Sequence, residues 1–388
     1  MIRTYGLSFI AALAVMACGC GSGSGRAALQ QGLAALQEKN YSGAIAHLTT
    51  ASKRITDSSA LYYSLGLAHL HQGNIEPALG AFSAALELEP SHAGALTCVG
   101  QIAYLQNDLN KAQACYEQAL EAAADDAMRT RILTSLALVE AGRNRYDLAR
   151  LHLIHALKLS RANPYAPALY NLASLYRDAF NLREEALDNF EMYVRMADRK
   201  DPHYDKAANN IKRLRLNLER TQAEELDRVR RNPSAAAKLL REGTHWQVEK
   251  QYAKAIKYYS DALLEDPFTF NAAFGLAVTC KNQGLRAEAM EAFLKATVIN
   301  PDYQDCYYQA AELALQLKRY AEAAKILDRA IARSPYHAAN VELMARIRYS
   351  EKRLPEARAY GEFYLSLLRA EDKNRAAYET WVRSLPKK

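Results

Sequence analysis

Small and apolar residues recur at fixed positions in the stretch Ser59–His92. Counted from Ser59, they are Tyr62, Leu65, Gly66, His69, Ala78, Phe82 and Ala85. At about 3.6 residues per turn, the first four share one helix face and the last three share another. Gly73 stands between the two groups, where a left-handed cap can end a helix, and Pro90 follows the second group. The pattern predicts two helices joined by a tight turn.

Copies of this unit occupy most of the chain. They start at Gly25, Ser59, Ala93, Thr130, near Ala166, and then at Ala236, Phe270, Gln304 and Ala338. The last copy departs most, because Gly361 replaces the large residue at position 24 and Tyr364 replaces the small residue at position 27. The sequence therefore predicts about nine helical pairs, in arrays of five and four.

The pattern lapses between the two arrays. Residues 204–231 contain no Gly or Pro and carry an apolar stripe of Ile211, Leu214, Leu218, Leu226 and Val229. Pro202 precedes this run, and Asn232 and Pro233 follow it. We interpret it as a linker helix, with a degenerate sixth repeat as the alternative.

The repeated unit resembles the tetratricopeptide repeat, a helix–turn–helix of about 34 residues with the pattern W-x2-L-G-x2-Y, then A-x3-F, then P. This resemblance implies an all-α fold, an α-solenoid with a linker helix and a C-terminal capping helix. The expected organisation is a signal peptide at 1–17, a Gly/Ser tether at 18–25, a first array at 26–200, a linker helix at 201–235, a second array at 236–371 and a capping helix at 372–388.

The N-terminus resembles a bacterial lipoprotein signal. One positive charge at Arg3 precedes an apolar run, Tyr5–Ala17, that is too short to span a bilayer. Cys18 follows, with a Gly/Ser segment after it. The resemblance implies cleavage before Cys18, its lipidation, and, from Gly19, an outer-membrane site facing the periplasm. The alternatives are an ordinary signal peptide with an incidental cysteine, or an uncleaved leader on a cytoplasmic protein.

Charge and motifs argue against several classes of function. The net charge is +7, and the 50 basic and 43 acidic residues are mostly interleaved, so no nucleic-acid footprint is expected. The chain has no Gly-rich phosphate loop, G-x-S-x-G or H-E-x-x-H. His152 and His155 are three apart, but no further ligand follows at metal spacing. We expect no enzyme activity, no cofactor and no metal.

The residues opposite the buried stripe of each first helix are the candidate binding site. By the family's example these positions line a concave groove that binds peptides. The candidate contact residues are Tyr63, His71, Tyr104, Tyr170, Arg177, Phe274, Asn282, Tyr308 and Tyr349. Aromatic residues with polar neighbours suit such a surface. The alternative, given equal weight, is that the tyrosines pack between adjacent first helices.

Two cysteine pairs lie in neighbouring helices of the predicted repeats. Cys98 and Cys115 fall in one repeat, and Cys280 and Cys306 fall in successive repeats. They could form disulfides in an oxidising compartment or serve as small buried residues.

The expected function is a membrane-anchored, non-catalytic scaffold that binds other proteins or peptides. Some lipidated tetratricopeptide proteins are pilotins or assembly factors for a type IV pilus or secretion channel, which is the first alternative. A cell-wall hydrolase, or a regulator of one, is the second.

Overall fold

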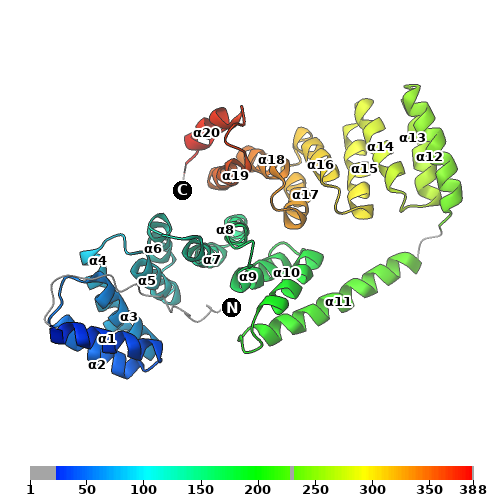
Figure 1. The fold of residues 1–388 in the computed structure, drawn as a ribbon. Helices are drawn as coiled ribbons and strands as arrows, with labels where there is room; N and C mark the ends of the chain where they lie inside the picture. Colours follow the sequence, from blue (N-terminus) through cyan, green and yellow to red (C-terminus); the bar gives the residue numbers. More distant parts are fainter. Residues whose placement is uncertain (1–22, 228–230, 387–388) are drawn as a thin grey trace. The chain divides into compact units, whose positions relative to one another are not determined.

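The computed structural model describes residues 23–227 and 231–386, and this part of the chain is helical without any strand (Figure 1). The predicted all-α fold is confirmed. Contacts divide the chain into two units, Met1–Asn171 and Leu172–Lys388. The division falls within one helix, Ala166–Asp178, whereas the sequence placed array boundaries at 200 and 235. Each repeat in a solenoid contacts mainly its neighbours, so the repeat pattern alone does not decide where a chain divides.

The helices of the first unit follow one another with short connections. They are α1 (Gly23–Gln37), α2 (Tyr41–Ser52), α3 (Ser59–Gln72), α4 (Ile75–Leu88), α5 (Ala93–Leu105), α6 (Leu109–Glu121), α7 (Asp126–Gly142) and α8 (Tyr146–Leu159), and α9 (Ala166–Asp178) continues into the second unit. Because α1 begins at Gly23, the last three residues of the predicted Gly/Ser tether are helical. The predicted signal peptide and Cys18 lie outside the described residues.

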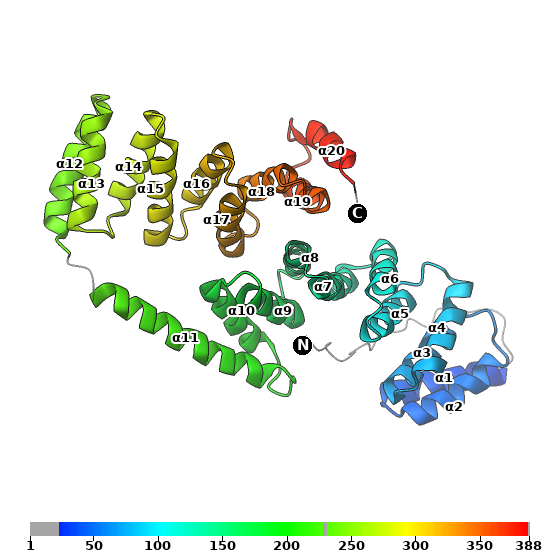
Figure 2. The same cartoon turned by 180° about the vertical axis from the view of Figure 1, so that it is seen from behind.

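The second unit continues the same plan after α9. Its helices are α10 (Arg183–Met196), α11 (Tyr204–Asp227), α12 (Pro233–Val248), α13 (Tyr252–Glu265), α14 (Phe270–Asn282), α15 (Arg286–Ile299), α16 (Gln304–Gln316), α17 (Tyr320–Arg333), α18 (Ala338–Ser350), α19 (Leu354–Leu367) and α20 (Arg375–Ser384). The reverse view shows α12 to α17 as successive pairs (Figure 2). None of the described helices combines the length and apolar composition that spanning a membrane requires.

A left-handed residue marks the turn of every helical pair. In the described chain these residues are Lys39, Gly73, Asn107, Asn144, Asn181, Lys250, Gly284, Lys318 and Lys352. At Gly73, where φ is 85°, the cap N–H reaches back to the His69 and Leu70 carbonyls, as in a left-handed helix cap. The recurrence of this turn agrees with the prediction of about nine repeats.

A close contact between the two helices of each pair explains the repeated pattern. Position 24 is large and buried in eight repeats, as Leu48, Phe82, Tyr116, Leu153, Phe190, Tyr259, Phe293 and Leu327. Position 8 lies opposite it and must be small. A Cβ atom on Gly66 would stand 2.5 Å from the Phe82 ring, so glycine lets the two helices meet there.

The predicted linker run forms a single helix, α11, as far as Asp227. It packs against α10 by its N-terminal half, where Ala207 and Leu214 are buried. The next helix, α12, pairs with α13 instead. Asn232 caps α12 by accepting a hydrogen bond from the Ala235 N–H at 3.2 Å, and Pro233 takes the first helical turn.

Candidate functional site: the first-helix faces

Position 5 of the repeat lies opposite the buried stripe of the first helix, and its exposure differs along the chain. Three neighbouring repeats of the first unit bury it, as Tyr63, Thr97 and Thr134. The second array leaves it half-buried throughout, as Leu240, Phe274, Tyr308 and Glu342. Side chains that can contact a partner at this position therefore lie mainly in the second array.

Tyr63 belongs to the packed core between the second and third repeats. It is 5% exposed, and its ring centroid lies 6.1 Å from that of Phe82 and 4.7 Å from that of His92. A Cβ on Gly94 would stand 2.8 Å from Tyr63 Cζ, so the glycine makes room for this ring. Burial raises the pKa of the phenol, and the nearby Cys98 raises it further. Of the two readings given for the tyrosines, packing between first helices holds for Tyr63, which offers a partner little surface.

Two further predicted residues, His71 and Tyr104, are partly covered by neighbouring side chains. His71 stacks on Tyr41, with ring centroids 4.8 Å apart and planes 7° from parallel. Burial, and then the charge of Lys39, lower the pKa of His71. Tyr104 is half-buried against a core cluster, and burial raises its pKa.

The fifth repeat carries two further predicted residues on α9. Tyr170 is half-buried. Arg177 donates hydrogen bonds to the carboxylate of Asp178 at 2.6 and 2.7 Å, and its guanidinium lies 5.6 Å from the centre of the Phe190 ring. Much of the donor capacity of Arg177 is therefore used within the chain.

An aromatic group surrounds Phe274 in the second array. Its ring centroid lies 5.9 Å from that of Phe270, 6.0 Å from that of Phe293 and 5.7 Å from that of Tyr303. Tyr303 is exposed and was not predicted as a site residue, because it stands in the connection before α16 and not on a helix face. Asn282 is exposed at the end of α14.

The end of the second array brings charged and aromatic residues together. Tyr308 on α16 lies near Glu312, Glu342 and Arg346. Burial raises the pKa of Tyr308, the two carboxylates raise it further, and Arg346 lowers it. Tyr349 on α18 is 49% exposed, and its ring centroid lies 5.9 Å from that of Trp381 on α20. The sequence pattern puts Tyr308 and Glu342 at position 5 of the candidate groove with Tyr349 near them, although Glu342 was not among the candidate contact residues.

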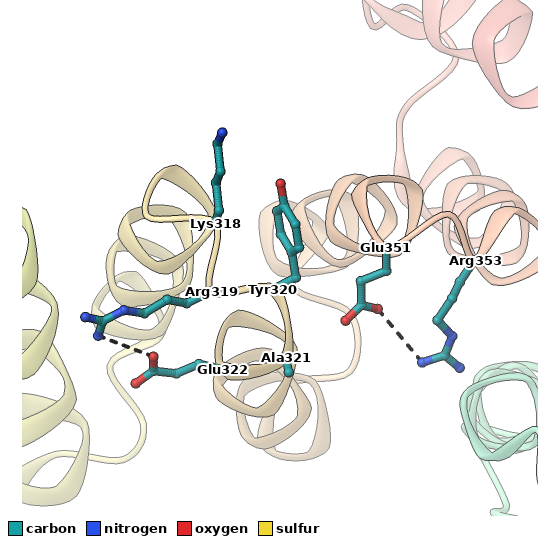
Figure 3. A pocket seen from close by; sticks show the side chains of 7 residues that line it. All are labelled: Lys318, Arg319, Tyr320, Ala321, Glu322, Glu351 and Arg353. Atoms are coloured by element: carbon teal, nitrogen blue, oxygen red, sulfur yellow. Dashed lines mark ion pairs between the residues drawn. The ribbon is translucent and has the colours of Figure 1, made fainter.

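A shallow pocket of about 700 Å³ lies between the turns of the eighth and ninth repeats (Figure 3). None of the predicted site residues lines it. Of its five charged side chains, which include Lys318, four form two ion pairs, Arg319 with Glu322 at 3.6 Å and Arg353 with Glu351 at 3.9 Å. Its charge is therefore largely balanced from within.

The cysteines outside the leader are free thiols in the structure. Burial raises the pKa of Cys98 to about 12, and burial, with Asp305, raises that of Cys306 to about 12. A thiol that holds its proton to such a pH is a weak nucleophile and metal ligand. Within residues 23–227 and 231–386, no three His, Cys, Asp or Glu side chains gather as a metal site.

Comparison with known families agrees with the repeat pattern. A model described as "Tetratricopeptide repeat" matches residues 29–93, 63–127 and 244–304, and a second model with the same description matches residues 304–337. These matches fall in both predicted arrays.

Two curated proteins are similar to part of this chain. The mouse (Mus musculus) protein "Superkiller complex protein 3" is 25% identical over 273 residues, which is 69% of this chain and 17% of that protein. The human (Homo sapiens) protein of that name is 24% identical over 260 residues, 66% of this chain and 16% of that protein. This chain thus spans about a sixth of the length of these curated relatives.

Solved structures resemble the chain at low identity. The TPR2AB-domain:pHSP90-complex of yeast Sti1 is 17% identical and covers 68% of this chain and 99% of that chain, with a TM-score of 0.30. MamA from Desulfovibrio magneticus is also 17% identical and covers 46% of this chain and 97% of that chain, with a TM-score of 0.40. Together with the family models, the helical pairs identify residues 29–127 and 244–337 as tetratricopeptide repeats.

Proposed function

We propose that this chain is a membrane-anchored, non-catalytic scaffold that binds other proteins or peptides along the first-helix faces of its repeats. Stacked helical repeats form extended binding surfaces, because each repeat adds a similar helix face beside the last. The observation that carries the proposal is the half-buried series at position 5 of the second array, where Phe274 and Tyr308 follow one another at the repeat spacing. Tyrosine and phenylalanine supply contact area with few rotatable bonds.

Crosslinking in the native organism tests the groove. The variant F274A/Y308A/Y349A removes three aromatic side chains from first helices. We expect it to recover fewer partner proteins than the parent chain, since hot spots of binding concentrate in such residues. An unchanged set of partners would contradict the groove.

A matched control removes apolar area from the second helices. Leu264 on α13 and Val298 on α15 are 79% and 66% exposed. The variant L264A/V298A should recover the same partners as the parent. Circular dichroism must show the same helix content in both variants.

The membrane anchor is the second part of the proposal, and it rests on the leader sequence. Lipidation of Cys18 would hold the repeats at the periplasmic face of the outer membrane, and two or more acyl chains give stable anchoring. Labelling with a radioactive fatty acid should mark the parent chain but not C18A. C20A, which replaces the other cysteine of the leader region, Cys20, should still be marked. A label that persists in C18A would overturn this assignment.

The absence of catalysis is tested on the purified protein. Incubation with peptidoglycan should leave it intact, as expected of an adaptor. Release of soluble muropeptides would instead favour the hydrolase alternative.

A further inference from the structure

The last repeat departs from the pattern at two positions, and the structure gives both a role. At position 24, a Cβ on Gly361 would stand 2.6 Å from Val382 Cγ2 and 3.3 Å from Trp381 Cζ3. Glycine therefore lets α20 settle against α19, where the other repeats hold a large side chain. At position 27, Tyr364 lies against Tyr378 of α20, with ring centroids 4.7 Å apart.

These departures complete a cluster around Glu342. We define the terminal cluster as Tyr308 and Glu312 on α16, Glu342 and Arg346 on α18, Tyr364 on α19 and Tyr378 on α20. Burial raises the pKa of Tyr308, Tyr364 and Tyr378, and the negative charge of Glu342 raises all three pKa values further. Three helices, α16, α19 and α20, thus bring aromatic side chains near one carboxylate on α18.

Glu342 has a partner on its own helix and stays partly exposed. Its side chain is 22% exposed, and Arg346, whose Nη1 lies 3.8 Å from Oε2, lowers the pKa of Glu342 by its charge and by hydrogen bonding. Within the described chain no hydrogen bond reaches the buried hydroxyl of Tyr378. Two carboxylates, Glu342 and Glu312, face one guanidinium, so the terminal cluster carries an excess of negative charge.

We propose that the terminal cluster binds a positively charged side chain, lysine or arginine, of a partner polypeptide. This inference rests on the proposed scaffold function and adds the chemistry of one contact. A cation gains from a partly desolvated carboxylate and from the faces of aromatic rings within about 6 Å. An anionic group would meet both carboxylates, and only Arg346 would favour it.

Fluorescence of Trp381 provides the readout, because its ring centroid lies 4.9 Å from that of Tyr378. The chain has two tryptophans, so W246F leaves Trp381 as the single reporter. The probes are acetylated, amidated pentapeptides with a central lysine, arginine, norleucine or glutamate between alanines. We expect saturable changes in emission with the lysine and arginine peptides and none with the other two.

Variants in the W246F chain separate the cluster from general electrostatics. E342Q keeps the shape of the side chain and removes its charge, so the lysine peptide should bind at least about tenfold more weakly, a loss typical of a buried charge partner. R346Q should bind it more tightly, because the competing cation is gone. E322Q removes a carboxylate from α17 that pairs with exposed Arg319, and it should bind like the parent.

Three results would overturn the inference. They are equal affinity of E342Q and the parent for the lysine peptide, equal binding of the lysine and norleucine peptides, and no saturable binding at all. If E342Q failed to fold, E312Q and Y378F would decide the question, each by a smaller loss of affinity. Loss of peptide binding in E342Q is distinct from the groove test, which follows partner recovery in F274A/Y308A/Y349A.

Discussion

The middle repeats of the first unit and the repeats of the second array use the same helix position in opposite ways. In the first unit, Tyr63 fills space beside Gly94. Thr97 donates its hydroxyl hydrogen bond to the Ala93 carbonyl at 2.7 Å, and Thr134 donates to the Thr130 carbonyl at 2.8 Å. In the second array, Tyr308 and Glu342 are half-buried and lie among charged side chains. The buried stripe that makes a repeat therefore leaves the opposite face free to close by packing or to stay open.

The largest test of this difference removes the ring at position 5 in each region. Y63A should lower the free energy of unfolding by about 3–4 kcal/mol, because it leaves a cavity among buried rings. Y308A should cost only about 1 kcal/mol, because its ring is half-buried. Urea unfolding followed by circular dichroism measures both. Equal losses would mean that the two positions are packed alike.

The next effect compares the last repeat of the second array, which has glycine at position 24, with the other repeats, which have a large side chain there. G361A places a methyl group against Val382, and we expect a loss of about 1–3 kcal/mol, as for other overpacked contacts. Trp381 should then become more exposed, so its emission should shift to the red. Emission unchanged from the parent would show that α20 does not depend on this glycine.

Two glycines of the second repeat separate turn geometry from packing. A Cβ would meet no atom within 4 Å at either Gly73 or Gly80, so only the backbone differs. G73A forces a left-handed residue to carry a side chain and should cost about 1–2 kcal/mol. G80A lies within α4 and should stabilise by up to about 1 kcal/mol. Thermal unfolding of both variants should give shifts of opposite sign.

The smallest effect concerns the charge of Glu342 at position 5 of the second array. Burial raises the pKa of Glu342, and Glu312 also raises it, whereas Arg346 lowers it. The phenols of Tyr308, Tyr364 and Tyr378 are the other titratable groups that face it. The folded state therefore holds this proton to a higher pH than the unfolded state. The stability from this group is complete below the ordinary pKa of glutamate and is lost as pH rises through the raised pKa.

Thermal unfolding of E342Q across pH checks the sign. Since the glutamine side chain does not titrate, E342Q should be more stable than the parent at pH 7, by less than about 1 kcal/mol, and equal to it near pH 4. E322Q, at an exposed pair, should show no such trend. A parent chain that gains stability over E342Q as pH rises would contradict the raised pKa.

The site was less predictable than the fold for a reason seen in particular residues. Tyr63, Phe274 and Tyr308 occupy the same repeat position, yet Tyr63 is buried and the other two are half-buried. What decides this is the neighbouring repeat: Gly94 makes room for Tyr63, whereas Tyr308 stands beside Glu312 and Arg346. The sequence of a single repeat does not determine how closely the neighbouring repeat packs against it.

The sequence by itself determined the helical pairs, their approximate number and the left-handed cap at Gly73, because these depend on spacing within one repeat. Phe82 opposite Gly66 is such a local requirement. Only the tertiary structure decided which residues of the opposite face remain open and what Gly361 and Tyr364 are for. Their role depends on α20, a helix outside the repeat, whose contacts exist only once the chain is packed.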